Sequence, residues 1–381
     1  MAYISGMRAL VIGSALALAL VTQRPAQAAV SALATQSNPM ILDVDAREAA
    51  RGLLRTHFRV PVAPGAFTLV YAKWIPGEHG PTGPLGDLAA LSIKANDHSL
   101  AWTRDAVDLY AFHVDVPAGV SALDVDFDVL MNKPDEPMAT GNVAIVHWER
   151  ALLYQADINV RDAYVKASII LPSNWDYGTA LPDAVRSGDR VDFGEVNLET
   201  LVDSPLDCGR YAKHIPLWQG DNTQTVLDLF ADAPQDLDIP DSILKPYKAV
   251  TTQALALYGA RHWNVYHFLL TLSDTISEEG IEHHQSSDNR GSADYMTSAD
   301  RQSVDGDLLT HEFSHSWNGK YRRPASLTTP NYQEPMKTDL LWVYEGMNQY
   351  LGEVLALRSG IYEAKKYPDM LAYHYAHLDM E

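Results

Sequence analysis

The sequence contains a single cysteine, Cys208, among 381 residues. An intrachain disulfide is therefore impossible, and the fold must be held by its core or by a metal ion. Basic residues are also scarce, because 29 Lys and Arg stand against 49 Asp and Glu and give a net charge of −20. The acidic residues are spread along the chain without runs of like charge. Such a surface repels nucleic acid and anionic membranes, so neither is an expected partner.

The apolar run near the N-terminus is too short for a membrane span, which needs about 20 residues. This run, ALVIGSALALALV at 9–21, follows Arg8 and precedes small residues at Ala26 and Ala28. That order is typical of a signal peptide with a small-x-small cleavage site. We expect residues 1–28 to be removed and the mature protein to be exported, periplasmic or secreted, with no membrane contact after cleavage. A membrane anchor is the alternative.

The composition, 46% hydrophobic and 20% charged, is that of a globular protein with room for two or three domains. From 38 to 205, short runs rich in β-branched and aromatic residues, such as FTLVYAKWI at 67–75, alternate with turn clusters. In LDVDFDVL at 123–130, apolar residues alternate with Asp, which predicts a strand with one buried and one wet face. We predict an N-terminal all-β domain over 38–205, an antiparallel sandwich.

From residue 206 the pattern changes to α+β. Strands are predicted at 225–232 and 265–274, and helices at 240–259, 302–319, 339–359 and 361–379. The last helical pattern reaches Glu381 without a polar tail or a cap signal. We therefore expect the second domain, 206–381, to be incomplete at its C-terminus.

The segment His311-Glu312-Phe313-Ser314-His315 has the spacing of a metal site. On a helix, positions i and i+4 lie on one face, so both imidazoles can point at one ion. Glu312 is turned by about 100° from His311, which places its carboxylate beside the metal, where it can accept a proton from an activated water. The alternative is a surface helix that happens to contain two histidines.

A hydrolytic zinc site needs a third protein ligand and an open fourth position. Glu345 is the best candidate, because it lies in an apolar stripe at helical spacing that predicts a mostly buried helix. A glutamate there must be paired, protonated or bound to metal. An ion pair with a nearby Arg or Lys is the alternative. Glu334, in a Pro-flanked loop, and Glu353, one or two turns further along, are weaker candidates.

Several stretches of the sequence resemble those of a known protein family. The stretch HEFSHSWNGKYRRP, then LTTPNYQEP, then LLWVYEG with Glu345 30 positions after His315, closely resembles the glycyl aminopeptidase family of gluzincin zinc peptidases. The resemblance extends to YAKWIPGEHGPTGP at 71–84, WTRDAVDLYAFHV at 102–114 and EEGIEHHQSS at 278–287. It implies a β-sandwich followed by a thermolysin-like α+β catalytic domain. Members commonly carry a PDZ domain near the C-terminus.

The same resemblance assigns roles to residues. It implies that His311, His315 and Glu345 bind one zinc ion (Zn2+) and that Glu312 is the general base. Asn318 and Arg323, which match the family's WNxKxxRP stretch, are plausible local supports for the histidines.

A second implied site binds the substrate. In related aminopeptidases, a glycine-rich edge strand ends in a glutamate that holds the substrate's free amino group. Here Glu282 stands 29 positions before His311, with Gly280 and His283 beside it. A carboxylate facing an ammonium would let only the first peptide bond reach the metal. The alternatives are an exposed loop carboxylate and, for His283, either polarising a carbonyl or being solvated.

We therefore expect a zinc aminopeptidase that acts on peptides with a free N-terminus and, on the resemblance alone, prefers small residues such as Gly or Ala. Asn348 and Leu351 stand where the family often has Thr and Tyr. The oxyanion-stabilising donor of gluzincin aminopeptidases would lie beyond Glu381. A zinc endopeptidase, or a non-catalytic peptide-binding or chaperone-like module that keeps the fold and the metal, are the alternatives. The sequence does not specify the oligomeric state.

Overall fold

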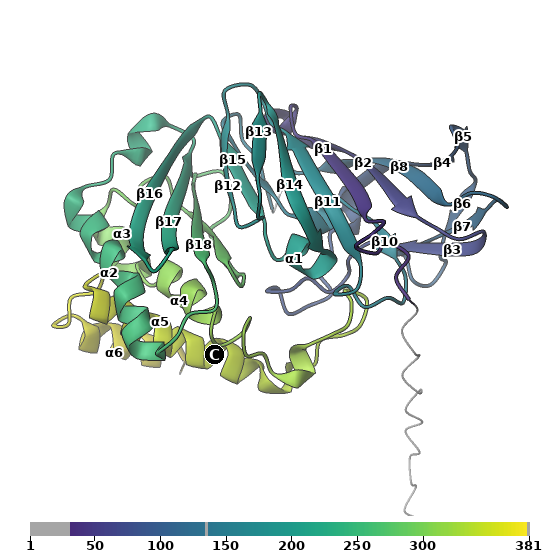
Figure 1. Cartoon of the computed structure of the whole chain (residues 1–381). Coiled ribbons are helices and arrows are strands. Elements are labelled where there is room, and N and C mark those ends of the chain that lie inside the picture. Colours follow the sequence, from purple (N-terminus) through teal and green to yellow (C-terminus); the bar gives the residue numbers. More distant parts are fainter. Residues whose placement is uncertain (1–30, 134–135, 379–381) are drawn as a thin grey trace, which may run out of the picture.

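The computed structural model describes residues 31–133 and 136–378. The expected signal peptide, residues 1–28, lies outside the described residues. The β-rich N-terminal part forms one side of the molecule, and the helices of the second part gather on the other (Figure 1). In the described ranges no helix is both long and apolar enough to cross a bilayer.

Three sheets make up the N-terminal part. The largest has eight strands in the order β13-β14-β11-β1-β2-β8-β4-β5, with the bounds β1 Met40–Asp45, β2 Leu53–Pro61, β4 Leu88–Ala95, β5 His98–Ser99, β8 Ala122–Leu130, β11 Tyr164–Ile170, β13 Val185–Ser187 and β14 Arg190–Asn197. A four-stranded sheet, β10-β3-β7-β6, contains β3 Gly65–Val70, β6 Trp102–Arg104, β7 Ala111–Val116 and β10 Tyr154–Gln155. A three-stranded sheet, β12-β15-β9, contains β9 Val143–Val146, β12 Asp176–Thr179 and β15 Leu206–Gly209.

The predicted β-rich first part is confirmed, with differences of detail. In β8, Leu123, Val125 and Phe127 are at most 2% exposed while the Asp residues between them are half-buried, as the alternation requires. Side chains of the eight- and four-stranded sheets share one core, as in a sandwich. The expectation of purely antiparallel pairing is wrong for β1 and β11, which pair in parallel because a long crossover brings β11 back beside β1. Pairing also continues past residue 205, because β15 pairs with β9 and β12.

The second part contains a five-stranded sheet and most of the helices. The sheet order is β16-β17-β18-β20-β19, with β16 Tyr211–Gly220, β17 Thr223–Ala231, β18 Val265–Leu272, β19 Glu279–Glu282 and β20 Ser286–Gly291. The α-helices of the described chain are α1 Leu198–Val202, α2 Asp241–Tyr258, α3 Ala299–Asp305, α4 Leu308–His315, α5 Met347–Ser359 and α6 Tyr367–Leu378. A π-helical turn covers Trp342–Gly346, and 3-10 turns cover Ala49–Arg51, Leu85–Asp87, Trp148–Arg150, Pro234–Leu237, Ala325–Leu327 and Thr338–Leu340.

Three predictions for this part need correction. The helix expected at 302–319 is divided into α3 and α4, because Asp307 leaves the helix and hydrogen-bonds with the Tyr362 hydroxyl. The strand predicted at 225–232 is present as β17, but the prediction was incomplete because it lacked β16, the other arm of the same hairpin. The helix around Glu345 is not mostly buried, since Trp342 is 73% and Tyr350 61% exposed.

Helix α4 lies between the sheet and α5. Phe313 is fully buried, with its ring centroid 4.5 Å from that of Tyr266 and 5.0 Å from that of Phe268 on β18. On the other side Gly352 of α5 packs so closely that a Cβ there would lie 2.8 Å from Cα of His311. The apolar face of α4 is thus fixed on the sheet, and its histidines face the turn that precedes α5.

Candidate metal centre

Three side chains converge between α4 and the π-helical turn. Nε2 of His311 and Nε2 of His315 lie 3.1 Å apart, and Oε2 of Glu345 lies 3.4 Å and 3.2 Å from them. One ligand atom from each residue lies within 4.8 Å of the others. The structure thus brings together the three residues that the sequence singles out as metal ligands.

These separations fit a zinc ion. With ligand atoms about 2.0–2.1 Å from the ion in tetrahedral geometry, neighbouring ligand atoms lie roughly 3.3 Å apart. The three measured separations, 3.1, 3.2 and 3.4 Å, are close to that value. Two imidazoles and a carboxylate are a donor set that zinc prefers in hydrolytic sites. Glu345 is 36% exposed, which leaves one side of the cluster open to solvent.

Asn318 orients one of the histidines. Its backbone carbonyl accepts a hydrogen bond from Nδ1 of His315 at 3.1 Å, which leaves Nε2 unprotonated toward the cluster. Its side-chain amide donates to the carbonyls of Val343 and Tyr344 and to Oδ1 of Asn348. Asn318 therefore connects the end of α4 to the turn that carries Glu345.

The electrostatics of the cluster favour a cation at its centre. Burial alone would lower the pKa of His311, but the contact with Glu345 and the charge of Glu312 raise it to about 9. Burial would raise the pKa of Glu345, but its contacts with His311, His315 and His79 hold that pKa well below its usual range. A proton or a metal ion would each satisfy this arrangement.

Glu312 lies beside the cluster with its carboxylate buried. Burial raises the pKa of Glu312 to about 8; the neighbouring His311 opposes this, and the carboxylates of Glu282 and Glu345 add to it. Gly280 of the edge strand β19 lies directly against this carboxylate, since a Cβ on Gly280 would be 2.9 Å from Cδ of Glu312 and closer still to Oε1. A glutamate with such a pKa can both accept and return a proton near neutral pH.

A cavity of about 370 Å³ opens beside His311 and Glu312. Strand β19 borders it on one side and the start of α4 on the other. The lining is acidic, with carboxylates of Glu278, Glu279, Asp305 and Asp307. Arg290 also lines the cavity but is paired with Glu279. The potential of this cavity therefore favours a cationic group over an anionic one.

Models of known protein families match two stretches of the chain. A model described as the peptidase M61 N-terminal domain matches residues 41–210, and one described as M61 glycyl aminopeptidase matches 305–381. Together these ranges hold 247 of the 381 residues. The chain belongs to the M61 glycyl aminopeptidase family.

Solved structures share the fold of this glycyl aminopeptidase family member. An aminopeptidase N family protein from Idiomarina loihiensis superposes with a TM-score of 0.71 at 19% identity, over 86% of this chain and 56% of that one. An M1 zinc metallopeptidase from Deinococcus radiodurans gives 0.52 at 13% identity, over 93% and 76%. The chain thus spans little more than half of the Idiomarina structure. No curated protein sequence matches the chain.

The residues expected to bind substrate lie at the end of β19, the edge strand of the five-stranded sheet. Glu282 is 3% exposed, and its Oε1 accepts a hydrogen bond from the Tyr344 hydroxyl and lies 3.7 Å from Nζ of Lys320. Burial would raise the pKa of Glu282, but Lys320 and nearby histidines lower it to about 2. His283 is also buried, and its Nδ1 faces Asp203 at 3.3 Å. The exposed or solvated alternatives for these two residues do not hold.

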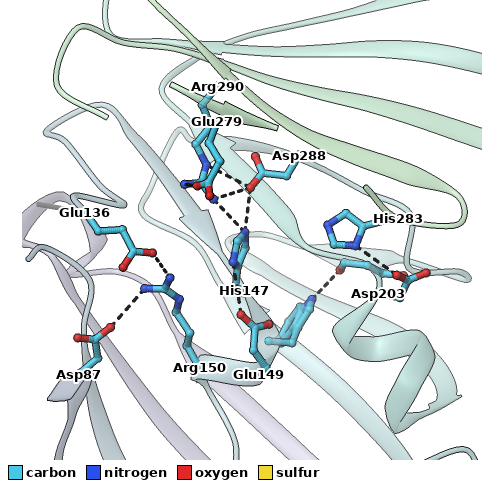
Figure 2. Close-up of polar contacts among 12 residues, drawn as sticks. Asp87, Glu136, His147, Glu149, Arg150, Asp203, Glu279, His283, Asp288 and Arg290 are labelled. Carbon is cyan, nitrogen blue, oxygen red and sulfur yellow. Dashed lines mark hydrogen bonds and ion pairs between the residues drawn. The ribbon is translucent and has the colours of Figure 1, made fainter. Parts of the chain in front are cut away.

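Figure 2 shows the charged side chains that connect this edge strand to its neighbours. Arg290 of β20 donates to Glu279 of β19 at 2.6 Å and to Asp288 at 2.7 Å. His147, from the N-terminal part, lies between Asp288 at 2.9 Å and Glu149 at 3.4 Å. Strand β19, which borders the cavity at Glu312, is therefore connected to the N-terminal part through paired charges, of which Arg290, Asp288 and His147 are buried and the Glu279 side chain is 40% exposed.

The other candidates named from the sequence lie outside the ligand cluster. Glu353 contacts the Tyr367 hydroxyl and Gln349, and neither Glu353 nor Glu334 belongs to the described group of metal-ligating atoms. Nε of Arg323 donates to the carbonyl of Gly319 at 3.0 Å, so it supports the loop after α4.

Sequence reasoning missed one residue at the centre, His79. Its Nε2 lies 2.6 Å from Oε1 of Glu345, although the two are 266 positions apart. The only signal for it is the stretch WIPGEHGPTGP, which carries the family resemblance but no metal-ligand spacing.

Proposed function

We propose that this chain is the zinc-binding part of an exported aminopeptidase that removes small residues, Gly or Ala, from peptides with a free N-terminus. The observation that carries this proposal is the cluster of His311, His315 and Glu345 with buried Glu312 beside it and an edge strand alongside. One zinc ion held by these three residues would polarise a peptide carbonyl and lower the pKa of water.

Glu312 supplies the proton transfer. Its carboxylate accepts the proton of the attacking water and returns a proton to the leaving amine as the C–N bond breaks. Burial of the carboxylate raises the pKa of Glu312, which favours its protonated form and so the return of the proton to the leaving amine.

Strand β19 supports the binding of an extended peptide. It is the edge of the five-stranded sheet, so one side of its backbone is not paired within the sheet. A peptide can add to such an edge as a further strand. Gly280, without a side chain, lets this edge lie directly against the carboxylate of Glu312, so a peptide added to the strand would lie close to the proposed base.

The charge of the cavity supports exopeptidase over endopeptidase action. The cavity is lined by four carboxylates besides that of Glu312, and they favour an ammonium group. Glu282 remains our proposed amine anchor, but Tyr344 and Lys320 already contact its Oε1, so an ammonium would have only Oε2 available. The preference for Gly or Ala is supported by the family likeness alone.

A direct test compares Gly- and Ala-aminoacyl reporters with the same peptides carrying an N-acetyl group. We expect hydrolysis of the free-amine forms and at least a 100-fold lower rate for the acetylated forms, about 3 kcal/mol of lost transition-state binding. Equal rates would identify an endopeptidase. Tight peptide binding without turnover, and no further loss on Glu312→Gln, would identify a non-catalytic peptide-binding module. Export is tested separately, by whether the mature protein lacks residues 1–28.

A further inference from the structure

We propose that His79, from the β-rich N-terminal part, is a positioning residue of the metal centre. Its Nε2–H donates to Oε1 of Glu345 and so holds Oε2 toward His311 and His315. This inference rests on the proposed zinc site, but it concerns how the site is held in shape and not which bond is cleaved.

The two oxygens of Glu345 have different partners. Oε1 lies 2.6 Å from Nε2 of His79, and Oε2 lies 3.4 Å and 3.2 Å from the histidines of α4. A carboxylate at the end of a glutamate side chain rotates easily, and a hydrogen bond to one oxygen fixes which oxygen faces the ion. His79 itself is outside the group whose ligand atoms all lie within 4.8 Å. His79 therefore contacts the ligand Glu345 and does not itself belong to the group that would bind the ion.

The loop that carries His79 is held in an unusual conformation. His79 has φ +51°, in the left-handed region that side chains other than Gly rarely adopt. Gly77 has φ +93°, and a Cβ on it would lie 2.6 Å from Cγ2 of Ile281 on β19. Strained backbone of this kind persists where the surroundings enforce it, and it is concentrated at functional sites.

Ring contacts and loop anchors leave the imidazole little freedom. The side chain of His79 is 16% exposed, and its ring lies 5.1 Å from that of Tyr344, which in turn lies 4.8 Å from the ring of His315. The loop is tied down on both sides, by Trp74 N–H to the carbonyl of Tyr332 at 2.8 Å and by the Tyr110 hydroxyl to the carbonyl of Gly83 at 2.6 Å. The donor is therefore preorganised before any ion binds.

The hydrogen bond between His79 and Glu345 connects the two parts of the chain. His79 belongs to the N-terminal part and Glu345 to the second part, so the ion's third ligand is held from across the boundary between them. Binding of the ion and packing of the 76–83 loop must then stabilise each other, because the two processes share one hydrogen bond.

The test uses the full chain with His79→Ala, His79→Gln and a control, His98→Ala, in which an exposed histidine of β5 is removed. Gln keeps an N–H donor at a similar reach from the backbone. The first readout is the zinc dissociation constant from chelator competition. The second is the visible absorption spectrum of the Co2+-substituted protein, which reports ligand geometry and does not depend on turnover. A cooperative unfolding transition, measured for each variant without metal, shows that the variant is folded.

We expect His79→Ala to weaken zinc binding about 10- to 100-fold and to change the Co2+ spectrum. His79→Gln should restore both to near the wild-type values, and His98→Ala should leave both unchanged. A His79→Ala protein that is folded, binds zinc within twofold of wild type and keeps the wild-type spectrum would overturn the inference. A wild-type protein that binds zinc but cleaves no peptide would refute the proposed function and leave this inference standing, whereas one that binds no zinc would overturn both.

Discussion

The backbone of Gly280 lies against the carboxylate of Glu312, so that a Cβ at position 280 would be 2.9 Å from Cδ of Glu312. Strand β19 and helix α4 can approach this closely only because position 280 has no side chain. The proposed general base Glu312 and strand β19 thus lie in direct contact, and a single methyl group added at position 280 would push them apart.

Replacement of Gly280 by Ala should therefore displace Glu312 and lower kcat/KM by about 10- to 100-fold, since small misplacements of a catalytic group have effects of this size. Zinc content should stay at the wild-type level, because Gly280 does not contact the ligand cluster. Gly86→Ala is the matched control, as no atom lies within 4 Å of a Cβ at that position. Equal activity of the two variants would show that Glu312 is not confined by β19.

Glu312→Gln should separate catalysis from metal binding. The amide has the size of the carboxylate but cannot accept the proton of water, so peptide hydrolysis should fall by at least about 100-fold. Zinc content and the temperature of unfolding should change little, because Glu312 is not among the clustered ligand atoms. Retention of more than a tenth of the wild-type rate would contradict the role of Glu312 as base.

Asn318→Ala should weaken the connection between α4 and the turn that carries Glu345. The side-chain amide bonds to two carbonyls and to Asn348, and its loss leaves buried acceptors without a donor, which costs about 1–3 kcal/mol of unfolding free energy. The backbone carbonyl that orients His315 remains, so zinc should still bind, but less tightly. Urea denaturation and chelator competition measure the two effects. Asn264→Ala, at an exposed position, is the control and should change neither.

The buried His147 should make stability depend on pH. Burial would lower the pKa of His147, but Glu149 and Asp288 raise it to about 9, although Arg290 also faces its ring. Because the pKa is higher in the folded than in the unfolded chain, this stabilisation is complete below about pH 6.5 and is lost as the pH rises toward 9. The loss should approach about 3 kcal/mol.

Urea denaturation of wild type and His147→Gln at several pH values between 6 and 9.5 checks this. The difference in unfolding free energy between the two proteins should shrink as the pH rises through that window. A difference that stays constant with pH would mean that His147 does not change its charge there.

Local patterns predicted much of the fold and the core of the site. The alternation in β8 and the spacing of His311 and His315 each specify a face of one element, and such periodicity survives in the structure. The buried Glu282 and the split of the 302–319 helix were not predictable in this way. They depend on Tyr344, Lys320 and Tyr362, partners whose approach is set by tertiary packing.

The same reason explains why His79 was missed. A histidine in a loop, 266 positions from Glu345, has no periodic relation to the metal motif, and its role appears only when the two parts of the chain are packed together. The burial of the helix around Glu345 was overestimated because apolar spacing on a helix predicts which residues share a face, but not whether another element covers that face.

The metal content of purified wild type and His315→Ala, measured after dialysis against metal-free buffer, tests the central claim most directly. We predict close to one zinc ion per wild-type chain and only background zinc in the variant, with the variant still folded. A folded His315→Ala protein that retained the full wild-type zinc content would contradict the assignment of this site.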